Sequence, residues 1–381
     1  MNDNIHLVKS ATLVYGFWGQ NIGNAFFNIG GKWLLEQLLG ANNIFLIADH
    51  PAYRTFYPQL RGNPRKALNL LEYVDTEYLV AQGPLFSSSF PSIWGPALER
   101  LSVRGIQVVF IGSAFFKYTR EEFRAVLDIL KKYPPKLIAT RDPRSYRILK
   151  EAGISSTLIN GIDSAFFVPE AYEPTPIAID DYIVLNFDRR PEPKIAISEK
   201  GRFGSAEREK VNIARAVGGA LNVPLEYSFQ FADKTYHLQF PVLASYFAKA
   251  SKALAYIGHA LDFRRLPDRI DGHLIVRTEH RSNPFVGWKV YRRPHSVVSD
   301  EPFTYLTVYA HAKLVLSDRV HANVAALAYG TPTMLFSPSP RGSLFEAVGA
   351  KEIRSRPVSL DPDLLRSRKE VYVNELMDKL L

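Results

Sequence analysis

Two short apolar runs flank a helix-compatible stretch between residues 314 and 336. Residues 314–316 predict a buried strand, 320–329 predict a helix, and 334–336 predict the next strand. A glycine and a proline directly after the helix-compatible stretch end it. Two strands joined through a helix lie parallel in the same sheet. The segment therefore predicts an α/β fold with a parallel sheet.

Arg319 and His321 directly follow the first of these strands. Ligands of strand–helix–strand units collect beyond the carboxyl ends of the strands, so both side chains are expected to face a cleft. Ser317 or Asp318 is expected to cap the helix. The alternative is that Arg319 pairs with an acid and that His321 only caps a helix end.

The first half of the chain repeats the alternation of strands and helices. Each predicted strand ends in a small or polar loop, and helices at 119–132 and 143–152 lie between strands. A further helix follows a glycine-rich turn and is expected to end near Leu39. The predicted strands cover 11–17, 44–49, 77–82, 107–111, 136–140 and 157–160. This pattern is typical of a doubly wound parallel sheet.

The second half begins after a proline-rich stretch at 169–176, which predicts a linker. Residues 256–288 are either a long irregular insertion or a set of short strands. The remaining predicted elements are a strand at 182–187 and helices at 207–221, 242–250, 303–312 and 364–381. A chain of 381 residues exceeds the usual size of a single core, which indicates two domains.

The balance of charge points to anionic partners. Lys and Arg number 47 against 38 Asp and Glu, which leaves a net charge of +9. The basic residues are spread over many segments, so small phosphorylated ligands fit better than nucleic acid. The chain has no cysteine, which excludes disulfides, thiolate metal sites and a cysteine nucleophile.

Targeting signals are missing from the sequence pattern. No apolar run approaches the ~20 residues needed to cross a bilayer. The first residues, MNDNIHLVKSATLVYGFWG, have no signal-peptide cleavage pattern. We expect a soluble cytoplasmic protein, and contact with the inner surface of the membrane is compatible with its positive charge.

Four segments together resemble the polysaccharide pyruvyltransferase family. They are GFWGQNIGNAFFNIGG, ATRDPRSYRILKEAGI, GIDSAFFVP, and SDRVHANVAALAYGTPTMLF followed by SPSPRG. The segments run from Gly16 to Gly342 in the order of the family. The serine-aspartate-arginine-x-histidine element is the most specific, because it leads into a small-residue helix and a Gly-x-Pro turn.

The resemblance implies two Rossmann-like lobes that face a central cleft, as in GT-B glycosyltransferases. It places an N-terminal Rossmann-like domain at 1–170 and a C-terminal one at 177–350. Residues 351–381 form a tail and a helix that, by analogy with other two-lobed proteins, packs back on the N-terminal domain. The implied activity is transfer of a pyruvyl group from phosphoenolpyruvate to two hydroxyls of a sugar. The product is a cyclic ketal on a surface polysaccharide or its lipid-linked precursor.

Arginines after predicted strands suit such a donor, which carries a carboxylate and a phosphate close together. The planar guanidinium group binds either anion through two parallel hydrogen bonds. We expect Arg141 and Arg319 to clamp the donor and Arg341 to hold its phosphate. Asp318 is assigned to the substrate-binding set as part of the same element. The alternative for Arg141 is an ion pair with Asp142 or a contact at a helix cap.

His321 is the expected acid or base of the reaction. Ketal formation requires a proton on the methylene carbon of the donor, and histidine titrates near neutral pH. Nearby arginines would lower the pKa of His321, whereas an acid such as Asp318 would raise it. If His321 is neutral, it would serve better as a base toward the sugar hydroxyl.

The turn that contains Gly16 offers backbone N–H groups near a helix start, a common contact for anions or sugars. Asn21 and Asn24 are candidates for binding sugar hydroxyls, and Trp18 is a candidate for stacking on a sugar face. Asparagines in turns more often bond the local backbone, and core packing is the usual role of a tryptophan. The family usually has an aspartate where this chain has Asn24.

No metal or cofactor is expected. The histidines of 256–295 lack metal-ligand spacing, and the glycine turn does not match the dinucleotide fingerprint. Two other functions stay open. A GT-B glycosyltransferase would use the same basic residues to bind a nucleotide sugar, and a non-catalytic glycan-binding protein could keep the fold without the opening aspartate. The sequence does not predict the oligomeric state.

Overall fold

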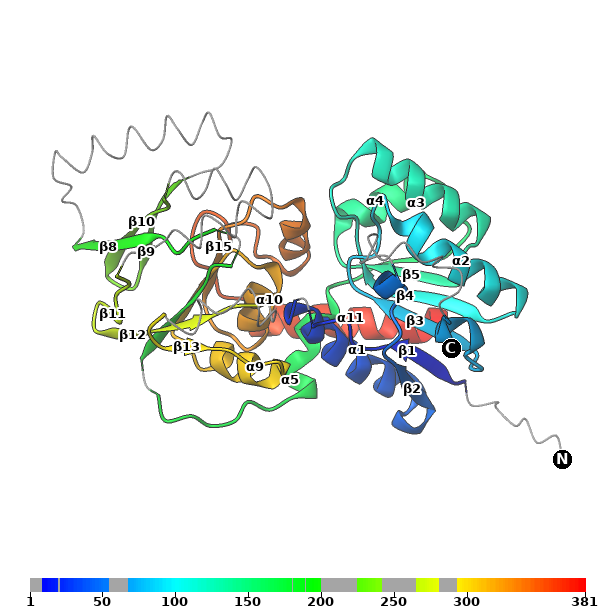
Figure 1. The fold of residues 1–381 in the computed structure, drawn as a ribbon, viewed down its shortest axis with the longest axis horizontal. Helices are drawn as coiled ribbons and strands as arrows, with labels where there is room; N and C mark the ends of the chain where they lie inside the picture. The colour runs from blue at the N-terminus through cyan, green and yellow to red at the C-terminus, as the bar shows by residue number, and fades with distance from the viewer. Residues whose placement is uncertain are drawn as a thin grey trace.

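A computed structural model of the chain describes residues 9–19, 21–54, 68–179, 181–188, 190–199, 225–241, 265–280 and 293–381. Two predicted helices, at 207–221 and 242–250, lie outside the described residues. The described elements form two lobes of the Rossmann type, each built around its own sheet, in a GT-B-like α/β arrangement (Figure 1).

The N-terminal lobe contains a parallel sheet in the order β2-β1-β3-β4-β5-β6. Its strands are β1 (Ala11–Val14), β2 (Ile44–Ile47), β3 (Tyr78–Gln82), β4 (Gln107–Ser113), β5 (Leu137–Thr140) and β6 (Thr157–Asn160). Its helices are α1 (Gly23–Leu39), α2 (Phe90–Val103), α3 (Arg120–Lys132) and α4 (Pro143–Glu151). Side chains alternate between the two faces of each strand, so Val80 packs with α1 and Leu79 packs with α2 and α3.

The C-terminal lobe contains a sheet in the order β11-β12-β7-β14-β15, and β13 pairs with β12. Only β11 runs antiparallel to its neighbour. The strands are β7 (Tyr182–Asn186), β11 (Arg269–Ile270), β12 (His273–Thr278), β13 (Ser296–Val297), β14 (Leu314–Ser317) and β15 (Thr333–Leu335). The helices are α9 (Pro302–Ala310) and α10 (Val320–Ala328).

The C-terminal helix α11 (Pro362–Leu380) lies against the N-terminal lobe, where it contacts β6 and α1. In Figure 1 it runs from between the lobes to the side of the N-terminal sheet. The Tyr372 ring lies 6.2 Å from the ring of Phe167, and Tyr78 Oη donates a 3.2 Å hydrogen bond to the carbonyl of Leu380. The short α5 (Val168–Ala171) precedes the first passage of the chain between lobes. The chain therefore passes between the lobes more than once.

Most predicted elements are confirmed within one to three residues at each end. The first strand ends at Val14 rather than at Phe17, because Gly16 has a φ of 118°, which breaks the extended conformation. Helix α2 is not predicted by the alternation, since two prolines and a glycine interrupt its sequence. Part of 256–288 is not irregular, because β12 is a central strand that pairs with β7.

Three further strands form a separate antiparallel sheet in the order β8-β10-β9. They are β8 (Lys194–Glu199), β9 (Glu226–Phe231) and β10 (Lys234–Gln239). Phe229, Tyr236 and Leu238 pack this sheet on the core of the C-terminal lobe. The sequence alternation of strands and helices does not predict this antiparallel sheet, because its strands are half polar.

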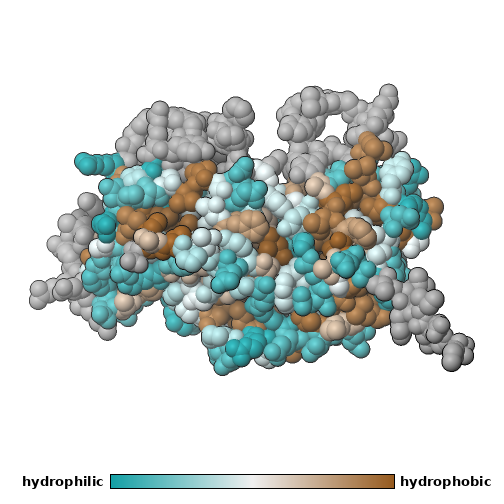
Figure 2. Space-filling view, turned by 90° about the horizontal axis from the view of Figure 1, so that it is seen from below, coloured by the Kyte–Doolittle hydropathy of each residue, from teal (hydrophilic) through white to brown (hydrophobic). Residues whose placement is uncertain are grey.

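Among the described helices, none combines the length and the apolar composition of a membrane-spanning segment. Figure 2 shows hydrophilic and hydrophobic residues sharing one face of the molecule. The largest exposed apolar side chains of a strand are Phe45 and Leu46, on β2 at the edge of the N-terminal sheet.

Candidate active site

Four charged side chains follow strand ends at the carboxyl edges of the two sheets. Arg141 and Asp163 come after β5 and β6, and Asp188 and Arg319 come after β7 and β14. The carboxyl ends of parallel strands lie at one edge of a sheet, which is where ligands of such folds bind. All four side chains are buried, with exposed fractions of 8% or less. Buried charges need partners, and the partners define two clusters.

The first, the inter-lobe cluster, consists of Arg141, Asp163 and His321. Arg141 Nη1 donates a 2.6 Å hydrogen bond to Asp163 Oδ2 and lies 3.2 Å from His321 Nε2. His321 belongs to α10 of the C-terminal lobe, whereas the other two residues belong to the N-terminal lobe. Burial alone would raise the pKa of Asp163, but Arg141 and then His321 hold it well below its usual range. The aspartate is therefore a fixed negative charge.

His321 is the neutral member of this cluster. A guanidinium group can only donate, so Nε2 accepts from Arg141 and the imidazole proton is assigned to Nδ1. Burial lowers the pKa of His321, Asp163 opposes this, and Arg141 and Arg341 lower it further. Among the described residues, no group bonds to Nδ1 of His321.

The second, the C-lobe cluster, consists of Arg319, Asp188 and His280. Arg319 Nε donates to Asp188 Oδ1, and the backbone N–H of His280 donates to Asp188 Oδ2 at 3.1 Å. His280 is buried and neutral, because burial lowers its pKa to about 3 despite the opposing charge of Asp188. The cluster is thus anchored on one carboxylate that accepts from two sides.

Neither Arg141 nor Arg319 presents an uncompensated charge, because each is paired with one aspartate. Pairing with an acid is the alternative given for both arginines, although Arg141 pairs with Asp163 rather than with Asp142. In the described part of the chain, however, Arg141 Nε and Arg319 Nη2 are buried and have no hydrogen-bond partner. Buried polar groups in folded proteins are nearly always bonded. Each arginine therefore keeps one buried nitrogen that no described residue bonds.

Arg341 reaches the inter-lobe cluster from a third direction. It belongs to the C-terminal lobe, yet its guanidinium carbon lies 5.3 Å from the centre of the Phe116 ring in the N-terminal lobe. Its Nε donates to Ser339 Oγ at 3.2 Å, and its charge lowers the pKa of His321. Arg341 is only half-buried, so it is the most accessible of the three arginines.

Two expectations for the acids beside these arginines are corrected. Asp318 does not cap α10, because its Oδ2 accepts from the backbone N–H of Arg190 at 3.0 Å and the N-cap residue is Arg319. Asp142 does not pair with Arg141. It caps α4 by accepting from Ser145 N at 2.8 Å. The local acids thus serve the backbone, and distant acids pair with the arginines.

The glycine-rich turn uses its asparagines locally. Asn24 Nδ2 donates to the carbonyl of Phe17 at 3.1 Å, and Asn21 Nδ2 donates to Asn24 Oδ1 at 3.0 Å. Trp18 is half-buried and meets Tyr15 edge to face at 5.2 Å between ring centres. These contacts fit the structural alternative for the turn and leave one face of Trp18 in reach of solvent.

The start of α1 docks between the two histidines of the C-terminal lobe. The backbone N–H of Ile22 donates to the carbonyl of His280 at 2.7 Å. A Cβ atom on Gly23 would lie 2.9 Å from His280 Nδ1 and 3.0 Å from His321 Cβ. Only glycine allows this approach, so Gly23 sets the distance between the lobes at the site.

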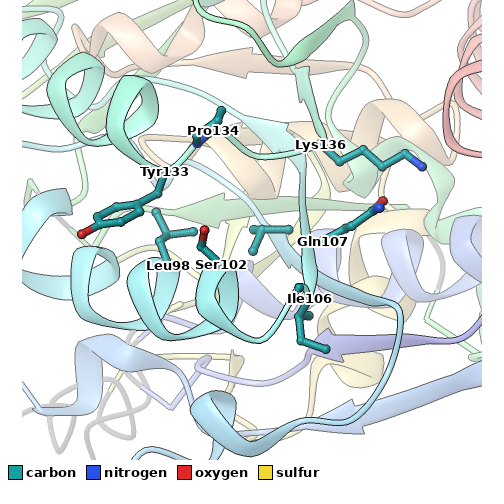
Figure 3. Close-up of a pocket in the computed structure, with 9 residues that line it drawn as sticks. Leu98, Ser102, Ile106, Gln107, Tyr133, Pro134 and Lys136 are labelled. Atoms are coloured by element: carbon teal, nitrogen blue, oxygen red, sulfur yellow. The ribbon is translucent and has the colours of Figure 1, made fainter.

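A cavity of about 420 Å³ lies elsewhere in the N-terminal lobe (Figure 3). It is lined by residues such as Leu98, Tyr133 and Lys136, beside the amino ends of β4 and β5. This is the edge of the sheet opposite to Arg141. Ligands of parallel α/β sheets bind at the carboxyl edge, so this cavity is not the candidate site.

Comparison with known proteins identifies the family. The family described as "Polysaccharide pyruvyl transferase" matches residues 21–340, which include both clusters. The chain belongs to this family. A search of curated proteins found no significant match. The family is a transferase family, and the two clusters are the candidate active site of this chain.

Solved structures similar to this pyruvyltransferase-family chain include several UDP-GlcNAc 2-epimerases. MnaA of S. aureus, in a co-structure with UDP, is 11% identical, with a TM-score of 0.47 over 97% of this chain and 89% of that one. UDP-GlcNAc 2-epimerase of Neisseria meningitidis, bound to UDP-GlcNAc, is 13% identical, with a TM-score of 0.45 over 97% and 93%. The enzyme of Methanocaldococcus jannaschii is 12% identical, with a TM-score of 0.44 over 96% and 93%.

Asp163, Asp188 and His280 are residues of the candidate site in this pyruvyltransferase-family protein that sequence reasoning did not select. A signal for the first two is present, because each follows a predicted strand at its carboxyl end, as the arginines do. His280 lies in the segment 256–288, for which an irregular insertion and short strands both stayed open, and its place beside β12 has no comparable local signal. Within the described ranges, no three carboxylate or imidazole side chains are grouped as metal ligands.

Proposed function

We propose that the enzyme transfers a pyruvyl group from phosphoenolpyruvate to two hydroxyls of one sugar and forms a cyclic ketal with release of phosphate. The acceptor class would be a surface polysaccharide or its precursor. One observation carries the proposal. Two buried guanidinium groups, on Arg141 and Arg319, each keep an unpartnered nitrogen at the carboxyl edge of a sheet, near the neutral His321. Family membership supports the same reaction.

Donor binding follows from the charges. The donor carries a carboxylate and a phosphate, and the nitrogens of Arg141 and Arg319 are donors with no competing acceptor in the described residues. We assign these two arginines to the donor and Arg341 to its phosphate. The paired aspartates hold the guanidinium groups in place, so little side-chain entropy is lost when the anion binds.

The reaction needs a base and an acid in turn. In the proposed sequence, one sugar hydroxyl attacks C2 of the donor while C3 gains a proton and becomes a methyl group. The second hydroxyl then displaces phosphate, which leaves with the remaining proton. No resident cofactor is required by this balance of atoms.

His321 is assigned as the group that moves these protons. Its Nε2 is blocked in the structure because it accepts from Arg141 Nη1. A donor anion that accepts the Arg141 N–H now directed at His321, while the bond to Asp163 holds the guanidinium in place, would release the lone pair of Nε2 as a base toward the sugar hydroxyl. The imidazolium formed would then lie 3.5 Å from Asp163 Oδ2, which stabilises it and prepares it to return the proton.

The test is a donor-binding and turnover experiment. Purified protein is mixed with phosphoenolpyruvate and a panel of free and lipid-linked sugars, and phosphate release and the methyl signal of a ketal are measured. We expect phosphoenolpyruvate, but not nucleotide sugars, to raise the melting temperature. Stabilisation by nucleotide sugars alone would instead support a glycosyltransferase. Glycan binding without phosphate release from any acceptor would support a non-catalytic protein.

A further inference from the structure

A chain of buried hydrogen bonds leads from the end of β14 to His280. Ser317 Oγ donates to Asn186 Oδ1 at 2.8 Å, and Asn186 Nδ2 donates to Thr278 Oγ1 at 3.0 Å. Thr278 Oγ1 lies 3.0 Å from Tyr309 Oη, which lies 2.6 Å from His280 Nε2. All five residues are buried. The members of this hydrogen-bond chain belong to β14, β7, β12 and α9, and the last member, His280, directly follows β12. The bonds therefore link four elements of the C-terminal lobe.

The donors and acceptors of this chain can all be satisfied together. Asn186 Nδ2 can only donate, so Thr278 Oγ1 accepts there, and one further hydrogen bond joins Thr278 Oγ1 to Tyr309 Oη. His280 is neutral because burial lowers its pKa to about 3, and its tautomer decides whether Nε2 or Tyr309 Oη donates the bond between them. With either tautomer, this bond holds the ring of His280 against Tyr309.

The backbone of His280 connects this hydrogen-bond chain to Arg319 and to the N-terminal lobe. Its N–H donates to Asp188 Oδ2 at 3.1 Å, and Asp188 Oδ1 accepts from Arg319 Nε. Its carbonyl accepts from Ile22 N of the N-terminal lobe at 2.7 Å. The ring and the backbone belong to one residue, so the bond between Tyr309 and the ring restrains where the backbone of His280 lies, and with it both of these bonds. The orientation of Arg319 therefore depends on groups that it does not touch.

We propose that Tyr309 and Thr278 are positioning residues that hold the guanidinium of Arg319 in place through His280 and Asp188. This inference rests on the proposed function only in assigning phosphoenolpyruvate as the anion that Arg319 binds. The hydroxyls of Tyr309 and Thr278 bond to each other and, at the two ends, to His280 and Asn186. Their proposed role is therefore to fix geometry and not to bind phosphoenolpyruvate. A loosely held binding group costs affinity even when it is present.

Helix α9 supplies a matched control in Tyr305. Its ring centre lies 5.8 Å from that of His280, as the Tyr309 ring does at 5.9 Å, and both tyrosines are fully buried. The hydroxyl of Tyr305, however, bonds to the backbone of Ser299, with the carbonyl at 3.0 Å and the N–H at 3.1 Å. The variants Tyr309→Phe and Tyr305→Phe thus remove the same atom from the same helix, and only the first breaks the chain.

The first measurement is the Kd for phosphoenolpyruvate together with the KM for the acceptor. We expect Tyr309→Phe to weaken phosphoenolpyruvate binding by ~5-fold or more, as for the loss of one hydrogen bond in a linked network. The acceptor KM should stay unchanged, and Tyr305→Phe should match the wild type. Thr278→Val should behave like Tyr309→Phe, and Thr278→Ser should restore binding because it keeps the hydroxyl. Equal effects of the two tyrosine variants, or no rescue by serine, would overturn the proposal.

A second measurement does not depend on the donor. The Nε–H resonance of Arg319, assigned by its loss in Arg319→Lys, reports the bond to Asp188 by its rate of exchange with solvent. We expect faster exchange in Tyr309→Phe than in wild type and no change in Tyr305→Phe. If wild type binds no phosphoenolpyruvate, the proposed function fails, and this exchange rate still decides the positioning role. Unchanged exchange in Tyr309→Phe would reject that role.

Discussion

The inter-lobe cluster and the C-lobe cluster each contain one arginine, one aspartate and one histidine. They differ in the exposure and the hydrogen bonding of the histidine. In the inter-lobe cluster, His321 is 8% exposed and no described group bonds to its Nδ1. In the C-lobe cluster, His280 is 1% exposed and its Nε2 is bonded to Tyr309. Both histidines have a lowered pKa because of burial. The proposed function accordingly gives proton transfer to His321, and the hydrogen bond to Tyr309 is consistent with a structural role for His280.

The origin of the residues explains this difference. The inter-lobe cluster joins Arg141 and Asp163 of one lobe to His321 of the other, so it is complete only when the lobes meet. The C-lobe cluster lies within a single lobe, and α1 of the other lobe contacts it at His280 through the bond from Ile22 N and the ring of Phe26. The binding group of such a site is fixed within one lobe, and the reacting group is complete only where the two lobes meet.

The largest effect is expected from Arg319→Gln, which removes the arginine of the C-lobe cluster. Activity should fall by ~100-fold or more, because the proposed function makes Arg319 one of the two arginines that bind the donor. The free energy of unfolding should also fall by about 3 to 5 kcal/mol, since Asp188 is left as an unpaired buried charge.

A matched control for this loss is the buried pair of Arg277 and Glu192, which is joined by two hydrogen bonds of 2.7 and 2.8 Å. Arg277→Gln should destabilise the protein to a similar degree, measured by urea unfolding. The folded fraction of this variant should still bind phosphoenolpyruvate. If Arg277→Gln weakened phosphoenolpyruvate binding as much as Arg319→Gln does, the role of Arg319 would be only structural.

His321→Gln tests the open histidine and should lower kcat by ~100-fold. The pH dependence of kcat/KM in the wild type then shows which protonation state of His321 is active. Because burial puts the pKa of His321 below 6.5, the neutral base is present at pH 7 and is lost as the pH falls through that lowered pKa. The acid limb of kcat/KM should therefore lie below pH 6.5 and be absent from the variant. A limb that persists in His321→Gln would assign the titration to another group.

Asp163→Asn sharpens the role of the inter-lobe aspartate and should lower kcat by ~10-fold, because the imidazolium loses its counter-charge. Asp163 raises the pKa of His321, so its removal should move the acid limb of kcat/KM to still lower pH. A shift to higher pH would contradict the assigned electrostatics.

Gly23→Ala gives the smallest expected effect and tests the docking of the lobes. The added Cβ atom would lie 2.9 Å from His280 Nδ1, so the start of α1 must move away from both histidines. We expect kcat/KM to fall by roughly 3- to 10-fold, as for a small misplacement of reacting groups. Gly19→Ala is the control, because no atom lies within 4 Å of the added carbon. Equal activity of the two variants would show that the contact does not matter.

The sequence predicted local elements well where apolar runs are short and bounded. The strands at β6 and β14 and the helices α1 and α3 follow from their own residues. The arginines were found by the rule that polar residues after parallel strands share one edge. Their partners were not, because Arg141 pairs with Asp163 and Arg319 with Asp188, which are distant in sequence. Neighbouring Asp142 and Asp318 were the natural local choices, and the backbone uses both.

Sequence reasoning also could not assign His280. Its position depends on β12, whose pairing with β7 is set by the whole sheet rather than by its own pattern. The hydrogen-bond chain through Thr278 and Tyr309 likewise joins residues of β12 and α9 that carry no shared motif. Tertiary packing, and not local propensity, decides which polar residues reach the site.

The return of α11 to the N-terminal lobe has a mechanical consequence. The polypeptide crosses between the lobes at 172–179 and again before α11, whose last turn is held by Tyr78. Two covalent tethers limit how far the lobes can separate or turn relative to one another. Severing one tether would therefore add directions of relative movement without removing any side chain of the two clusters.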